Sequence, residues 1–258
     1  MKEKKQGTRA MAWPEGYGRR VLAEVDSTNA EAVRIAGGLA GPEWICALRQ
    51  TAARGRRGRA WVNPEGNFAA TLVMRPSGTP ADAALRSFVA SLALFDAFVA
   101  LTGRTDGLSL KWPNDVLLNG GKVAGILLES VGGAGGLSHL AIGIGVNLRA
   151  APSVAEVETG AVRPVSLLDE TGIAVTPEDF LDALAEAFAT HEARFATYRF
   201  APIREAWLAR AARLGEEITA RTGTSETRGR FETVDGQGNL VLKTAGGRVA
   251  IAAADVFF

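Results

Sequence analysis

Four arginines lie within six residues of the chain, and only glycines interrupt them. The run reads Arg54-Gly55-Arg56-Arg57-Gly58-Arg59, and Trp61 follows it closely. Like charges this close repel one another, and glycine adds backbone freedom, so the segment has little reason to be ordered alone. Guanidinium groups match the oxygens of carboxylates and phosphates two at a time. We therefore expect residues 50–61, the arginine loop, to close over a small anionic ligand.

Two other interpretations of the arginine loop stay open. Arg/Gly runs are common in disordered nucleic-acid-binding tails, and a non-enzymatic RNA-binding module could use this loop together with Trp61. That module would be basic elsewhere as well, whereas the formal net charge of the whole chain is +1. A solvated surface loop without a function is the second alternative, and the charge density disfavours it.

A lysine, an asparagine and an aspartate come together in a second region. Asn119-Gly120 is a strong signal for a hairpin turn. The hairpin places Lys122 at the start of a strand, close in space to Asn114 and Asp115. Asp115 could hold Mg²⁺, and Lys122 could bind a carboxylate or a phosphate. By themselves Asn114 and Asp115 also fit an ordinary turn, but together with four arginines they suit nucleotide chemistry.

Ser27 and Thr28 lie where an expected strand runs into an expected helix. Thr28 followed by Glu31 predicts a capping box at the start of that helix. Free backbone N–H groups at such a corner favour negative charge, so the corner could bind an anion. Helix capping alone explains the pattern equally well.

The segment Gly143-Ile144-Gly145 lies in an apolar stretch that ends near Asn147. No helix follows it and the third glycine of a dinucleotide fingerprint is missing, so we do not interpret it as one. Glycines in a buried strand allow another backbone or a flat ring to approach. Asn147 could then hydrogen-bond an adenine.

The expected elements indicate an α+β fold with a mixed β-sheet flanked by helices. Short strands with glycine-rich turns follow from Glu217 onward and predict a small β-barrel domain. We assign residues 1–213 to the first domain and residues 214–258 to the second. Expected strands cover 20–25, 44–49, 67–75, 116–118, 122–124 and 140–148, and expected helices cover 28–36, 80–101, 166–169, 177–195 and 202–214.

Composition excludes several classes of protein. The single cysteine, Cys46, rules out an internal disulfide, and the two histidines, His139 and His191, are too far apart in sequence to suggest a histidine metal cluster. No apolar run follows the basic N-terminal residues, so we expect no signal peptide. No uninterrupted apolar stretch reaches the roughly 20 residues of a membrane span. We expect a cytoplasmic protein without a membrane partner.

Taken together, these motifs resemble those of the biotin protein ligases, and they occur in the family's order over most of the chain. The family usually has a glycine directly before the first arginine of the loop, where this chain has Ala53. If that position requires a positive φ, alanine is unfavourable there. The matching segments are Asp26-Ser27-Thr28-Asn29, Gln50 with the arginine loop and Trp61, Lys111-Trp112-Pro113-Asn114-Asp115, Gly121 to Leu127, and Gly143 to Asn147.

The resemblance implies a catalytic domain like that of class II aminoacyl-tRNA synthetases, followed by a C-terminal SH3-like β-barrel. It also implies a two-step reaction: the biotin carboxylate attacks the α-phosphate of MgATP to give biotinyl-5′-adenylate, and a lysine of a biotin carboxyl carrier protein then takes the biotin. By the same resemblance, catalysis falls to Lys122, Arg56 and Arg54. Biotin binding falls to Ser27, Thr28, Gln50, Arg54, Arg56 and Lys122, adenylate binding to Arg57, Arg59, Trp61, Asn114 and Asn147, and Mg²⁺ binding to Asp115.

A lipoate–protein ligase is the nearest alternative, because it resembles this family in fold and also forms an acyl-adenylate. The arginine loop favours biotin. Some family members carry an N-terminal winged-helix repressor domain, but here the catalytic pattern begins by Arg20. We therefore expect no nucleic-acid partner. A homodimer is possible, and the sequence does not identify the carboxylase that supplies the carrier.

Overall fold

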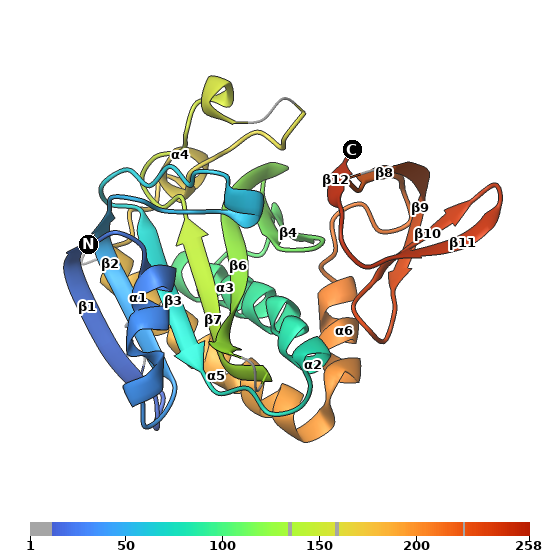
Figure 1. Ribbon diagram of the computed structural model, residues 1–258. Helices are drawn as coiled ribbons and strands as arrows, with labels where there is room; N and C mark the ends of the chain where they lie inside the picture. The colour runs from blue at the N-terminus through green and yellow to red at the C-terminus, as the bar shows by residue number, and fades with distance from the viewer. Residues whose placement is uncertain (1–11, 134–135, 158–159, 224) are drawn as a thin grey trace, which may run out of the picture.

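The computed structural model describes residues 12–133, 136–157, 160–223 and 225–258. A seven-stranded sheet dominates it, with the strand order β1-β2-β3-β7-β6-β5-β4 (Figure 1). β1 and β2 pair in parallel and the other neighbours are antiparallel, so the predicted mixed sheet is confirmed. The strands are β1 (Gly18–Val25), β2 (Glu43–Gln50), β3 (Phe68–Met74), β4 (Leu108–Lys111), β5 (Asp115–Leu118), β6 (Gly121–Gly133) and β7 (Gly136–Val146).

Helices cover both faces of this sheet. On one face, Trp44 and Leu72 belong to the core that α3 and α5 share, and the Trp44 ring packs edge-on against Phe188 of α5. On the other face, Ile45 and Val73 pack with α1. Every residue of β3 is buried, which confirms the prediction that this strand is covered on both sides. The helices are α1 (Thr28–Ile35), α2 (Pro80–Ala84), α3 (Arg86–Thr102), α4 (Leu167–Thr171), α5 (Pro177–Tyr198) and α6 (Phe200–Leu208).

The segment Pro80–Thr102, which contains α2 and α3, is long and apolar enough to cross a membrane by length and composition alone. Its most apolar window is 67% buried inside the protein. The core helix of a soluble protein has this same character, so the segment is only weak support for a membrane span.

Turn chemistry fixes the hairpin that the site depends on. Asn119 and Gly120 have φ values of 49° and 76°, and they join β5 to β6 as predicted. The hairpin brings Lys122 beside Leu117 in the register of these two strands. The start of α5 is also as predicted, because the Thr176 side chain accepts a hydrogen bond from the backbone N–H of Asp179.

A second, five-stranded antiparallel sheet forms the C-terminal part of the chain, with the order β11-β10-β9-β8-β12. Trp112 Nε1 donates to the carbonyl oxygen of Gly238 over 3.0 Å, so this small domain is joined to the segment just before β5. Its last strand lies on the side that faces the large sheet (Figure 1). The strands are β8 (Glu217–Arg221), β9 (Glu226–Val234), β10 (Leu240–Thr244), β11 (Gly247–Ile251) and β12 (Asp255–Phe257).

Candidate active site

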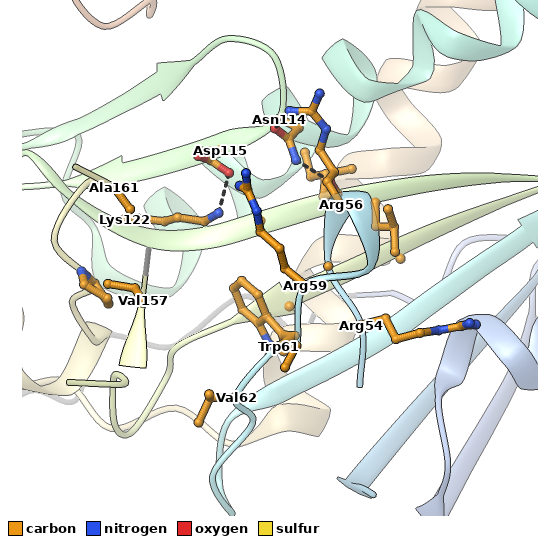
Figure 2. A pocket seen from close by; sticks show the side chains of 18 of the residues that line it. Arg54, Arg56, Arg59, Trp61, Val62, Asn114, Asp115, Lys122, Val157 and Ala161 are labelled. Atoms are coloured by element: carbon orange, nitrogen blue, oxygen red, sulfur yellow. Dashed lines mark hydrogen bonds and ion pairs between the residues drawn. The ribbon is translucent and has the colours of Figure 1, made fainter. Parts of the chain in front are cut away.

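A cavity of about 590 Å³ lies between the arginine loop, strands β6 and β7, the start of α1 and strand β12 (Figure 2). The arginine loop crosses it on one side and the β5–β6 hairpin forms another. All but one of the residues predicted for the site line this cavity: Ser27, Thr28, Gln50, Arg54, Arg56, Arg59, Trp61, Asn114, Asp115, Lys122 and Asn147.

Arg57 is the predicted site residue that does not line the cavity. Its backbone has a φ of 57°, in the left-handed region, and its guanidinium pairs with Asp255 at 2.7 Å. Arg54 lines the cavity, but its side chain points away from Lys122 and Asp115 (Figure 2). The adenylate contact of Arg57 and the catalytic role of Arg54 stay predictions.

The corner at the start of α1 is built differently from the predicted capping box. The N-cap residue is Ser27, whose side chain makes no capping hydrogen bond. Glu31 instead accepts from Arg34 over 2.7 Å. The backbone N–H of Thr28 donates to Gln50 Oε1 over 2.8 Å, so a strand residue takes over the capping function.

A buried hydrogen-bond network continues from this corner and includes Asn29, a residue to which we assigned no role from the sequence. Thr71 Oγ1 lies 2.5 Å from Asn29 Oδ1 and 2.8 Å from Thr28 Oγ1. The Asn29 oxygen can only accept, so the Thr71 hydroxyl donates to it. The Thr28 hydroxyl lies within hydrogen-bonding distance of both Thr71 Oγ1 and Gln50 Oε1, the latter at 3.1 Å. Asn29 Nδ2 donates to Glu129 over 2.6 Å. A Cβ on Gly143 would lie 2.2 Å from Asn29 Oδ1, so this glycine makes room for the network.

Positive charges surround the Asp115 carboxylate. Lys122 Nζ lies 2.7 Å from it, and Lys111 Nζ lies 3.8 Å from it. Burial alone would raise the pKa of Asp115, but the charges of Lys122 and Lys111 outweigh burial and lower it. Burial lowers the pKa of Lys111, and Asp115 opposes that shift. The predicted meeting of Lys122 with Asn114 and Asp115 is thus confirmed, and the carboxylate stays ionised.

Trp61 lies flat against two glycines of the sheet. A Cβ on Gly145 would come within 2.5 Å of the indole ring, and one on Gly125 within 3.2 Å. Lys122 Nζ lies 5.6 Å from the centre of the same ring, within range of a cation–π interaction. The expectation that strand glycines allow a flat ring to approach is confirmed, although the ring belongs to the protein itself.

The two asparagines predicted for the site, Asn114 and Asn147, make different contacts. Asn114 Nδ2 donates to the carbonyl oxygen of Ile126 over 2.7 Å, and its Oδ1 accepts from Arg56 Nη1 over 3.2 Å. Asn114 therefore holds Arg56 in place. Asn147 Nδ2 donates to the carbonyl oxygen of Val165, whereas its buried Oδ1 has no partner within the described part of the chain. An acceptor of this kind suits an amino group of a ligand.

The loop backbone forms a small hairpin of its own. Arg54 and Ala60 form an isolated antiparallel bridge, and the backbone N–H of Trp61 donates to the carbonyl oxygen of Ala53 over 3.1 Å. Ala53 is not among the residues with a positive φ. The alanine at this position therefore carries no left-handed backbone strain.

Asp255 is another residue of the site that the sequence did not reveal. Its carboxylate pairs with Arg57 at 2.7 Å, with Arg59 at 3.0 Å and with Arg56 at 3.8 Å. The prediction that the loop lacks order on its own did not include this counter-charge. Nothing in the sequence signals it, because Asp255 follows the arginines by nearly 200 residues.

Comparison with known proteins agrees with this geometry. The model of the "Biotin/lipoate A/B protein ligase family" matches residues 23–147, and that of the "Biotin protein ligase C terminal domain" matches residues 214–258. A biotin–[acetyl-CoA-carboxylase] ligase of Paracoccus denitrificans is 60% identical over 238 residues, which cover 92% of this chain and 99% of that protein. The chain belongs to the biotin protein ligase family.

Other members of the family are more distant. A biotin–[acetyl-CoA-carboxylase] ligase of Mycobacterium tuberculosis is 32% identical over 92% of this chain and 87% of its own length. A structure of the Aquifex aeolicus biotin protein ligase in complex with biotin and ATP superposes with a TM-score of 0.80 at 24% identity, covering 93% of this chain and 98% of that one. At that identity the likeness concerns the fold, and it includes the C-terminal β-domain of biotin protein ligases.

Proposed function

We propose that this protein activates biotin with ATP as biotinyl-5′-adenylate and transfers the biotin to a lysine of a carboxylase carrier domain. One observation carries the proposal: a single cavity joins the arginine loop, the Lys122–Asp115 pair and a tryptophan seated on sheet glycines. The 60% identical relative is named for this reaction on acetyl-CoA carboxylase. The same carrier is therefore the first to test.

The charged and polar groups of the cavity indicate where each part of the two substrates binds. Lys122 and Arg56 are the cations that flank Asn114 and Asp115, so the biotin carboxylate and the α-phosphate meet between them. Gln50 and Thr28 offer polar groups on the α1 side for the remainder of biotin. Trp61 and Asn147 supply a flat ring and a buried oxygen acceptor for the adenine.

The donor set is compatible with Mg²⁺ delivered together with ATP. The described residues contain no group of three or more His, Cys, Asp or Glu side chains that could hold a metal. Mg²⁺ is, however, commonly bound by one or two carboxylates and by substrate phosphates. Asp115 is the buried, ionised carboxylate that would hold it, and the bound ion would neutralise phosphate charge.

The chain's own groups account for the rest of the chemistry. Lys122 and Arg56 stabilise the charge that develops when the carboxylate attacks phosphorus, and they act in a partly closed site where water screens them little. The arginine loop and Trp61 cover the mixed anhydride and keep water from it. The amine of a carrier lysine then attacks the acyl carbon, so that an amide bond forms, the acyl–phosphate bond breaks and AMP leaves.

The direct test is incubation of an acetyl-CoA carboxylase carrier domain with biotin, MgATP and the protein, followed by mass spectrometry. We expect a gain of one biotin on one lysine. Biotin-dependent ATP–pyrophosphate exchange, compared with lipoate-dependent exchange, separates the two acyl-adenylate ligases. Exchange with lipoate and not with biotin would overturn the proposal in favour of a lipoate–protein ligase.

Three further expectations from the sequence stay predictions: a cytoplasmic location, the absence of a nucleic-acid partner and a possible homodimer. A near-neutral net charge of +1 supports the second of these. Salt-resistant, sequence-selective binding of DNA in a fluorescence titration would contradict it.

A further inference from the structure

Strand β12 of the C-terminal domain contributes a charged residue to the ligase cavity. Asp255, Val256 and Phe257 all line it. Asp255 is placed by its pairing with Arg221 in the neighbouring strand β8. Its carboxylate therefore projects from a regular sheet, and the sheet sets its position relative to the loop.

One carboxylate serves three loop guanidinium groups. Arg57 and Arg59 each lie within hydrogen-bonding distance of Asp255 Oδ2, at 2.7 and 3.0 Å, and Arg56 lies 3.8 Å from Oδ1. The Asp255 side chain is only 20% exposed. An isolated surface ion pair contributes little to stability, but a shared, half-buried carboxylate also relieves repulsion among the arginines themselves.

The backbone at the tip of the loop is strained at Arg57, one of the residues that contact Asp255. Arg57 adopts φ 57° and ψ 27°, a left-handed conformation that is unfavourable for a residue with a Cβ. This residue does not line the cavity. In this conformation its guanidinium pairs with Asp255 at 2.7 Å.

We propose that Asp255 is a positioning residue that holds the arginine loop closed over the cavity through Arg57 and Arg59. The C-terminal domain then takes part in adenylate retention without touching the reacting atoms. Breaking this contact frees the loop, and the reactive intermediate escapes sooner. The part concerning the intermediate rests on the function proposed above, whereas the part concerning loop closure does not.

Hydrogen exchange of the full-length protein without substrate tests the closure. In Asp255→Asn, we expect amides of residues 53–61 to exchange about ten-fold faster, the factor that corresponds to roughly one charge-assisted hydrogen bond. Arg57→Gln should give a smaller increase, because Arg59 still contacts Asp255 in that variant. Combining both substitutions should add little more. Asp255→Glu should restore much of the protection.

Glu217→Gln is the matched control. Glu217 lies on β8 of the same domain and pairs with Arg228 at 3.2 Å in an exposed ion pair remote from the loop. Glu217→Gln should leave the exchange rates of the loop amides as they are in the parent protein. Peptides from β9 and β10 report in every variant whether the domain itself has loosened.

The second measurement is the rate at which preformed biotinyl-adenylate leaves the protein. We expect it to rise about ten-fold in Asp255→Asn and by a smaller factor in Arg57→Gln. Unchanged loop exchange in Asp255→Asn would overturn the proposal, and so would slower adenylate release, which would mean that Asp255 competes with phosphate. An effect on the Mg²⁺ requirement alone, with Arg57→Gln silent, would overturn it as well. If the parent protein forms no adenylate at all, the proposed function fails while the exchange measurement still decides on closure.

Discussion

Lys122 carries the strongest prediction for a single residue. It is the cation nearest to Asp115, at 2.7 Å, and it also lies over Trp61. Lys122→Ala should lower biotin-dependent ATP–pyrophosphate exchange about 100-fold, the usual cost of removing one preorganised donor to a developing charge. Lys243→Ala, on β10 of the C-terminal domain, is the control and should leave exchange unchanged. Normal exchange in Lys122→Ala would remove this residue from the site.

Gly145 tests the seat of Trp61. A Cβ at this position would lie 2.5 Å from the indole, and the β7 backbone is held by neighbours on both sides. Gly145→Ala should therefore displace Trp61 and speed the release of adenylate about ten-fold, comparable to the loss of one aromatic stacking contact. Gly37→Ala, where a Cβ would meet nothing within 4 Å, is the matched control. Equal release rates in the two variants would show that Trp61 does not cover the adenylate.

The arginine loop is the element on which specificity for the carrier depends. Arg56 is held by Asn114 and lies in the cavity, so its loss should loosen the cover over the intermediate. We expect Arg56→Ala to release adenylate at least about ten-fold faster and to label lysines of unrelated proteins. Arg228→Ala, which removes an arginine from the exposed pair on β8, should not. Blotting for biotin on a bystander protein gives the comparison, and unchanged retention in Arg56→Ala would contradict closure by the loop.

Elements that depend on local chemistry could be predicted well from the sequence. Asn119-Gly120 specified its hairpin, and Thr176 with Pro177 specified the start of α5, because turn and cap preferences act over a few residues. The prediction of a capping box at Thr28 was wrong because contacts with distant residues replaced the local ones. The threonine hydroxyl found buried partners in the sheet, and Glu31 paired with Arg34, so tertiary contacts replaced the local pattern.

The parts of the site that the sequence did not reveal all depend on long-range contacts. Asp255 meets Arg57 across 198 positions of the chain, and Asn29 meets Glu129 across 100. Spacing along the chain carries no signal for such pairs.

At the scale of the whole molecule, the buried Asp115 carboxylate makes the free energy of unfolding depend on pH in the acid range. The pKa of Asp115 is lowered in the folded protein from an ordinary value of 3.8, so the unfolded chain binds more protons just below that value. The stability that Asp115 contributes is complete above this value and is lost as the pH falls through the lower folded pKa.

Asp115→Asn isolates that contribution. At pH 7 it leaves Lys111 and Lys122 without their buried partner and should lower the free energy of unfolding by about 3 kcal/mol. The difference from the parent protein should shrink as the pH falls well below 3.8, where the parent carboxylate is protonated too. Urea unfolding at a series of pH values measures it. A difference that stays constant down to the acid limit would show that charge is not the cause.

Two sheets thus meet at one cavity: the large one carries Lys122, Asp115 and the seat of Trp61, and the small one carries Asp255. The central claim is that the arginine loop closes over biotinyl-5′-adenylate in this cavity. Its most direct test is a crystal structure of the protein grown with biotin and MgATP. We expect biotinyl-5′-adenylate between Lys122 and Trp61 with residues 50–61 folded over it. Residues 50–61 extended into solvent, with the adenylate bound elsewhere, would contradict the assignment of this cavity and of the loop that covers it.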